Sequence, residues 1–213
     1  MKPEVDNYDL IRPLLTFDSD DEFYFLQILM RKKDHGKTVT GTNNNNRLVK
    51  AYFVRSMEYF DFIEDEVKKL AQVFKARATL NLNKRSYKKL AFHTLKKVTD
   101  QIVNEEYDKV NKAYTSVCGK YASDKNKTWI LDLDGDNFKD VERMILEVLP
   151  LCRGAEGNRH IASIPTRSGL HVITRPFALN DFNKLMYERF NVNWADHIEL
   201  HRNNPTNLYV PEM

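Results

Sequence analysis

The chain has 213 residues, of which 42% are hydrophobic and 30% are charged. This length suits one large or two small domains, and the composition is typical of globular proteins, not of disordered ones. No apolar run approaches the ~20 residues that a membrane helix needs, the acidic start does not resemble a signal peptide, and Cys118 and Cys152 are too few for a zinc cluster or a disulfide framework. We therefore expect a cytoplasmic protein without a membrane partner.

The net charge of +3 hides an uneven distribution of charged residues. Residues 1–30 carry 2 basic and 7 acidic groups, residues 31–130 carry 22 and 11, and the remainder carries 9 and 12. The middle segment therefore has a net charge of +11. Such a segment suits a phosphate-rich partner, although a solvated lysine-rich surface explains it equally well.

The first third of the chain predicts helices and a loop. Residues 1–21 have little periodicity and are expected to form an arm. Glu22 to Arg31 predicts a short helix, because it is rich in apolar side chains and follows aspartates suited to capping. Asp34 to Arg47 is polar and predicts a loop, and from Val49 to Lys75 apolar residues recur at helical spacing.

The middle of the chain predicts one strand followed by helix. Arg77 to Asn83 alternates like a strand, with a polar face that either meets water or lines a groove. Lys84 to Val103 predicts a helix with one basic face, and residues 104–127 predict its continuation followed by a polar loop. The expected buried stripe of this helix comprises Tyr87, Leu90, Ala91, Leu95 and Val98.

The C-terminal part alternates between strands and helices. Strands are predicted at Trp129 to Asp134 and twice within His160 to Thr174, turning at Arg167-Ser168-Gly169. Helices are predicted at Phe138 to Leu149 and Asn180 to Phe190, and His197 to Val210 predicts a final hairpin. This order fits a split βαβ, or ferredoxin-like, unit with an antiparallel sheet.

These elements predict an α+β fold in two parts. Residues 1–128 are expected to be mostly helical and basic, with at least one strand. Residues 129–213 are expected to form the RRM-like or ferredoxin-like antiparallel sheet unit. We expect the two parts to pack as one compact domain.

The run Leu131-Asp132-Leu133-Asp134 ends an apolar strand in two carboxylates. In a strand, Asp132 and Asp134 point to the same face, where they repel each other unless a cation or basic group lies between them. The sequence therefore predicts a site at this strand end.

Two other chemistries use a similar motif. An EF-hand calcium loop is excluded, because its sixth and twelfth positions would be Asn137 and Arg143 instead of glycine and glutamate. The motif resembles that of haloacid-dehalogenase-like phosphatases, in which Asp132 would be the nucleophile and Asp134 the general acid. However, Asp136 stands where threonine or valine is usual, and only ~80 residues remain for the βα units that this fold needs.

Two further motifs follow downstream. Ser168-Gly169-Leu170-His171 leads into a strand, and Ile198-Glu199-Leu200-His201 lies on a later one. In this order, LDLD, SGLH and IELH resemble the three motifs of the archaeo-eukaryotic primase superfamily, which includes primase–polymerases. The resemblance covers residues 130–211, and its third motif has glutamate where aspartate is common.

The resemblance implies a metal-dependent nucleotidyltransferase that makes or extends primers from nucleoside triphosphates on a single-stranded DNA template. Two Mg²⁺ or Mn²⁺ ions would be held by Asp132, Asp134 and Glu199. His171, Ser168 and Gly169 would bind the triphosphate, with Arg167 and Arg175 adding charge. The template phosphates would be bound by Lys84, Arg85, Lys88 and Lys89.

The resemblance also implies partners. Because no zinc module or helicase segment accompanies the motifs, the chain would be a minimal core that works with a separate helicase or replication protein. Such a small form would suit a phage or mobile element.

Several alternatives stay open at the residue level. Asp196 competes with Glu199 as the third carboxylate, but Glu199 shares its strand face with His197 and His201, which favours it. Asp136 is best explained as a cap of the following helix. A non-catalytic protein that binds single-stranded nucleic acid on a degenerate primase-like fold is the remaining alternative.

Overall fold

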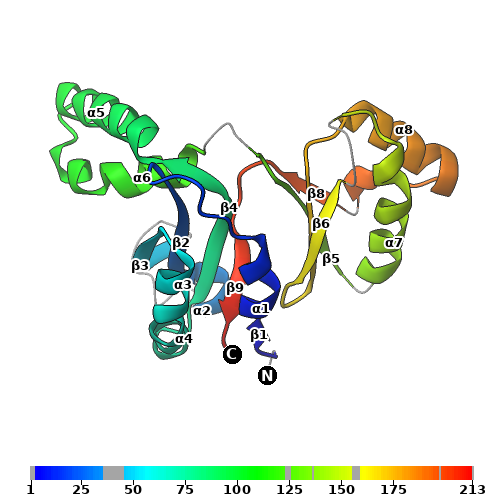
Figure 1. Cartoon of the computed structure of the whole chain (residues 1–213), viewed down its shortest axis with the longest axis horizontal. Helices are drawn as coiled ribbons and strands as arrows, with labels where there is room; N and C mark the ends of the chain where they lie inside the picture. Colours follow the sequence, from blue (N-terminus) through cyan, green and yellow to red (C-terminus); the bar gives the residue numbers. More distant parts are fainter. Residues whose placement is uncertain are drawn as a thin grey trace.

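Two antiparallel β-sheets organise the chain (Figure 1). The computed structural model describes residues 3–35, 46–122, 126–135, 137–154, 159–196 and 198–212. The mixed α+β class predicted from the sequence is confirmed. No helix within these ranges combines the length and the apolar character needed to cross a bilayer.

The first sheet has five strands in the order β1-β9-β4-β2-β3. Helices α3 and α4 cover one face, where Leu26, Ile28 and Leu80 share a core with Phe60 and Val67. Helices α5 and α6 cover part of the other face. The strands are β1 (Val5–Asp6), β2 (Glu22–Arg31), β3 (Asn46–Val54), β4 (Arg77–Ser86) and β9 (Thr206–Val210), and the helices are α1 (Tyr8–Ile11), η1 (Arg12–Leu14), α2 (Lys32–His35), α3 (Met57–Phe62), α4 (Glu64–Val73), α5 (Tyr87–Val103), η2 (Tyr107–Lys112) and α6 (Ala113–Lys120).

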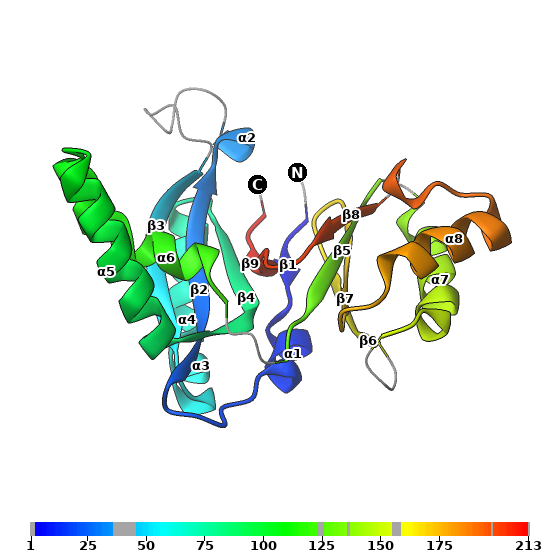
Figure 2. The same ribbon diagram turned by 90° about the horizontal axis from the view of Figure 1, so that it is seen from above.

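The second sheet has four strands in the order β6-β7-β5-β8, all antiparallel. Its elements follow one another as strand, helix, strand, strand, helix, strand, which is the connectivity expected of a split βαβ unit. Helices α7 and α8 cover the outer face (Figure 2), and the inner face is turned to the first sheet. The elements are β5 (Trp129–Asp134), α7 (Phe138–Val148), η3 (Leu149–Leu151), β6 (His160–Pro165), β7 (Gly169–Thr174), α8 (Leu179–Phe190), η4 (Trp194–Asp196) and β8 (Ile198–His201).

Several N-terminal predictions were wrong. Glu22–Arg31 is a central strand, not a helix, and Val49 to Val54 belongs to β3. Helix α3 begins only after Ser56, whose hydroxyl accepts a hydrogen bond from the Tyr59 N–H at 3.1 Å. The expected arm at residues 1–21 contains β1 and α1. The N-terminal part thus supplies four strands in addition to its helices.

Helix α5 also differs from its prediction. Its first three predicted residues continue β4, and the helix begins after Ser86, whose hydroxyl caps the Lys89 N–H. Leu95, which was assigned to the buried stripe, is 67% exposed. Residues 104–122 do not continue the helix, because η2 and α6 follow as separate elements. Most of the polar loop expected around Ser123–Lys127 lies outside the described residues.

The predicted final hairpin does not form, since its two strands lie in different sheets. β8 pairs with β5 in the second sheet, whereas β9 pairs with β1 and β4 in the first. The polar face of β4 holds the connections between the sheets. The side-chain amide of Asn83 donates to the carbonyls of Thr128 and Arg202, and its oxygen accepts from the Thr128 N–H at 2.7 Å. Asn81 likewise donates to the Asn203 carbonyl.

Candidate functional site

The strand register brings the three sequence motifs together. Asp132 on β5 lies directly opposite His171 on β7 and opposite Glu199 on β8. Directly opposed residues of antiparallel strands point to the same face. This face is turned toward the first sheet, because Ile130, two residues earlier on β5, belongs to the same buried cluster as Leu208 of β9.

Asp132, Glu199 and His201 form a cluster of possible metal ligands. One ligand atom from each lies within 4.8 Å of the other two. The Nε2 of His201 is 3.8 Å from Asp132 Oδ2 and 3.7 Å from Glu199 Oε1. Two carboxylates and one imidazole suit a divalent cation. His201 was not predicted as a ligand, although its position two residues after Glu199 placed it on the same strand face.

His171 is buried between Asp132 and the first sheet. Its Nδ1 lies 2.9 Å from the Thr206 hydroxyl of β9, and its Nε2 lies 3.4 Å from Asp132 Oδ1. Because both ring nitrogens have neighbours, the ring is fixed in orientation. The imidazole therefore positions the Asp132 carboxylate and ties it to the neighbouring sheet.

Asp134 ends β5 beside the Ser-Gly turn. The Ser168 hydroxyl donates to Asp134 Oδ1 at 2.9 Å, and the Gly135 N–H donates to the Ser168 carbonyl. A Cβ on Gly169 would lie only 1.8 Å from the Leu133 carbonyl oxygen, so this turn requires glycine. Asp134 is exposed and lies outside the three-residue cluster.

Part of the predicted site lies outside the described residues. Asp136 and His197 lie outside the described residues, and so does the side chain of Asp196. Between the two candidates for the third carboxylate, Glu199 is therefore the one whose position is known.

Two arginines of the first sheet, Arg31 and Arg77, interact with aspartates of this region. Arg77 binds Asp34 through two hydrogen bonds of 2.7 and 2.6 Å. Burial raises the pKa of Asp34, but the hydrogen bonds and charge of Arg77 outweigh it and hold that pKa below its ordinary value. Burial and the charge of Arg77 lower the pKa of Arg31, while Asp34, Asp132 and Asp134 oppose this shift. Arg31 therefore lies within electrostatic reach of the candidate site.

Arg167 adds a third guanidinium beside the Ser-Gly turn. Its Nη2 donates to the Pro211 carbonyl at 2.6 Å, and its Nε is buried without a hydrogen-bond partner in the described part of the chain. Burial lowers its pKa. Arg31 and Arg77 were not predicted as site residues, because Arg31 was assigned to a helix and Arg77 to an unspecified polar strand face.

Other predicted residues lie elsewhere. Arg175 follows the far end of β7, about 20 Å of strand away from Ser168, and lines a separate cavity of about 500 Å³ together with Lys84. Arg85 is fully buried and donates to the Cys118 carbonyl at 2.6 Å. Burial lowers the pKa of Arg85 to about 10. Arg85 is a structural residue, and its burial excludes the predicted contact with template phosphates.

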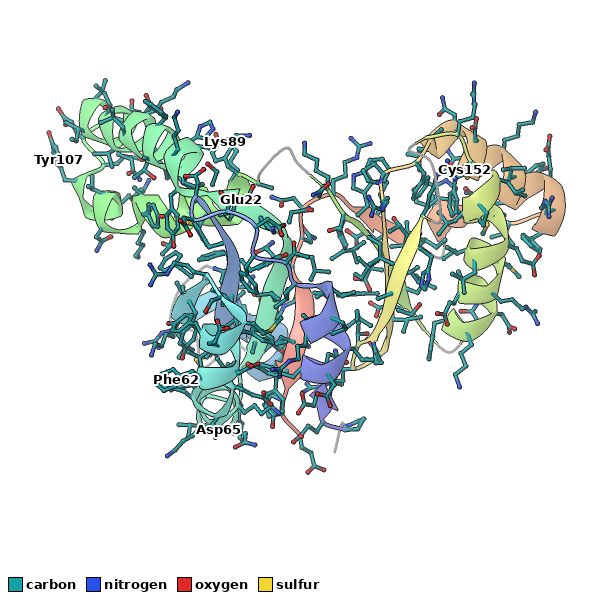
Figure 3. All side chains as sticks on the ribbon, viewed as in Figure 1. Glu22, Phe62, Asp65, Lys89, Tyr107 and Cys152 are labelled. Carbon is teal, nitrogen blue, oxygen red and sulfur yellow. The ribbon has the colours of Figure 1, made fainter. Side chains whose placement is uncertain are left out.

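The remaining predicted template residues have different surroundings. Lys84 forms ion pairs with Asp18 at 3.1 Å and Glu22 at 3.6 Å. The Lys89 ammonium lies 3.3 Å from the Ala122 carbonyl, and Lys88 is exposed. Figure 3 shows Lys89 and Glu22 at the end of the first sheet that α5 and α6 cover. The four predicted template contacts, Lys84, Arg85, Lys88 and Lys89, therefore do not form one basic surface.

Comparison with models of known protein families, with curated proteins and with solved structures finds no match to this chain. Its function therefore has to be inferred from the side chains around Asp132. The sheet itself weighs against the phosphatase alternative, because both neighbours of β5 are antiparallel to it, whereas successive βα units build a parallel sheet.

Proposed function

We propose that the chain is a metal-dependent nucleotidyltransferase of the archaeo-eukaryotic primase type. In this proposal it makes or extends primers from nucleoside triphosphates on a single-stranded template. The supporting observation is that Asp132 lies in register with both His171 and Glu199. The three motifs thus meet on adjacent strands of a split βαβ sheet, in the order expected for that family.

The carboxylates would hold Mg²⁺ or Mn²⁺. Asp132 and Glu199 supply oxygen ligands, with His201 beside them and Asp134 two residues along β5. Metal ions held there would supply positive charge to activate a primer hydroxyl and to neutralise the triphosphate. His171 orients Asp132, and Ser168 holds Asp134 by its hydroxyl. These contacts keep the ligands in place before the metal arrives.

The arginines would bind the phosphates of the incoming nucleotide. Arg31, Arg77 and Arg167 supply three positive charges around the single carboxylate of Asp34. A nucleoside triphosphate with its metal presents both cations and anions, so it suits a site that combines the carboxylates of β5 and β8 with guanidiniums from both sheets, Arg31 and Arg77 from the first and Arg167 from the second. The partly buried position of Arg31 limits the screening of its charge by solvent.

The direct test is nucleotide incorporation on a primed single-stranded DNA template with Mg²⁺ or Mn²⁺. Asp132→Ala/Asp134→Ala is expected to lower incorporation by at least about 100-fold, because it removes metal ligands. The matched control is Asp65→Ala/Glu147→Ala, which removes two exposed carboxylates from α4 and α7 and should leave the rate unchanged. Figure 3 shows Asp65 at helix α4, away from the second sheet. Incorporation that survives the Asp132/Asp134 substitutions would contradict the proposal.

A second measurement separates the enzyme from a non-catalytic binding protein. Calorimetric titration with a nucleoside triphosphate should show binding that depends on Mg²⁺ in the parent chain and is lost in Asp132→Ala/Asp134→Ala. A protein that only binds single strands would show no metal-dependent nucleotide binding.

A further inference from the structure

A small pocket between α5 and α6 gathers basic side chains. Its volume is about 150 Å³, and its lining includes Lys96 and Lys97 from α5 and Lys120 from the end of α6. His93 and Tyr121, which also line it, stack with ring centroids 3.7 Å apart and planes 7° from parallel. The stacked rings make this part of the wall rigid.

The three lysines lack ion-pair partners in the described part of the chain. Other lysines of the first sheet and its helices, such as Lys50 and Lys68, pair with carboxylates within 4.0 Å. The pocket lining contains one carboxylate, Asp100, against three ammonium groups. The pocket therefore carries excess positive charge that an anion would neutralise.

The pocket is connected to the strand that carries Glu199 and His201. The Asn203 side chain donates to the Lys120 carbonyl at 3.0 Å, and Asn204 lies 2.8 Å from His201 Nδ1. Residues 199 and 203 are four positions apart, so their Cα atoms are separated by at most about 14 Å. The end of α6 that carries Lys120 is therefore joined by a hydrogen bond to the segment that directly follows the strand of Glu199 and His201.

We propose that this pocket binds a backbone phosphate of the single-stranded nucleic acid whose other part lies at Asp132. The inference rests on the proposed function, since it names the surface that binds the single-stranded template. The pocket is smaller than the roughly 300 Å³ of the smallest typical ligand pockets, so it suits one phosphate group and not a whole nucleotide. In this proposal the lysines of α5 and α6 contact the single-stranded nucleic acid, in place of Arg85, which the sequence predicted for that role.

The test is fluorescence anisotropy of a labelled single-stranded DNA oligonucleotide at several salt concentrations. Lys96→Glu/Lys120→Glu is expected to weaken binding at least tenfold at low salt. It should also reduce the slope of log K against log salt by about 0.7, because the contact to one phosphate is lost. Lys69→Glu/Lys184→Glu has the same charge change on exposed residues of α4 and α8, and should keep the parent slope.

Further arms identify the ligand. Inorganic phosphate or a nucleoside monophosphate at millimolar concentration should not displace the oligonucleotide, and displacement would overturn the inference in favour of a free-phosphate site. Equal affinities and slopes in the two lysine variants would also overturn it. Asp132→Ala/Asp134→Ala should lose incorporation and keep oligonucleotide affinity. Loss of oligonucleotide binding in the lysine variant alone therefore supports the pocket as the binding site. Incorporation that is retained in the aspartate variant contradicts the proposed function and leaves the test of the pocket unaffected.

Discussion

Gly169 lies on β7 where the backbone of β5 leaves no room for a side chain. A Cβ there would lie 1.8 Å from the Leu133 carbonyl oxygen and 3.1 Å from the Asp134 Cα. Backbone atoms cannot move aside as a flexible side chain can, so Gly169→Ala must separate β5 from β7. We expect it to lower the free energy of unfolding by about 3 kcal/mol. Urea denaturation followed by circular dichroism measures this change.

Gly119 provides the matched control for that substitution. It lies in α6, and a Cβ there would meet no atom within 4 Å. Gly119→Ala should therefore raise the free energy of unfolding by about 0.5–1 kcal/mol, because alanine loses less backbone entropy in a helix. Equal effects of the two substitutions would show that the space at Gly169 is not as tight as described.

Residue types and alternation predicted part of the site. Asp132 and Asp134 could be expected on one face, because side-chain direction within a strand follows from sequence position alone. The approach of His171 and Glu199 to Asp132 depends on the register between strands, and only the resemblance to the primase motifs implied it. Arg85 could not be recognised as buried, since its pairing with backbone carbonyls depends on where α6 packs. Arg31 was missed for a related reason, because its strand was predicted as a helix.

At the scale of elements, β2 shows why some strands escape prediction. Tyr24, Phe25 and Leu26 are consecutive and all buried, because β2 lies between β3 and β4 and has cores on both faces. Such a run has no alternation and cannot be distinguished from a buried helix by periodicity. In contrast, β6 and β7 were predicted correctly, since a short turn with glycine separates them.

The side chain of Asn83 binds both chain segments that connect the two sheets, and its substitution gives a second test of stability. Its side chain bonds both connections, at Thr128 before β5 and at Arg202 after β8. Asn83→Ala should lower the free energy of unfolding by about 2–3 kcal/mol, because it leaves buried polar groups without partners. Asn83→Asp keeps the acceptor for Thr128 but places a charge against two carbonyl oxygens, so it should not restore stability.

Asn180 supplies the control for the Asn83 series. It is exposed in the first turn of α8, and Asn180→Ala is expected to change the unfolding free energy by less than about 0.5 kcal/mol. Thermal unfolding at neutral pH compares the three variants. If Asn83→Asp proves as stable as the parent, the two donated hydrogen bonds do not hold the connections.

At the scale of the whole molecule, the candidate site is shared between the two sheets. The chain passes from the first sheet to the second at residues 126–128 and returns at residues 202–205, so β9 completes the sheet that β1 begins. The packing of His171 against Thr206 joins the carboxylate sheet to β9. Arg31 and Asp132 lie near each other because the chain returns to the first sheet after β8. Local sequence patterns do not encode this return.

Substitution of Arg31 therefore tests how the two sheets face each other. It should change the affinities for the metal ion alone and for the metal–nucleotide complex in opposite directions. The charge of Arg31 acts on Asp132 and Asp134 from the other sheet, and its guanidinium makes no hydrogen bond or ion pair with a described residue. Arg31→Gln should strengthen binding of Mn²⁺ alone by about threefold, because one repelling charge is removed. The same substitution should weaken binding of the metal–nucleoside triphosphate complex by about tenfold or more, because a cation for phosphate is lost. Calorimetric titration measures both affinities.

Arg55→Gln is the matched control, because Arg55 lies at the opposite end of the β2–β3 pair, and it should alter neither affinity. A parallel loss of both affinities in Arg31→Gln would point to misfolding instead of a phosphate contact.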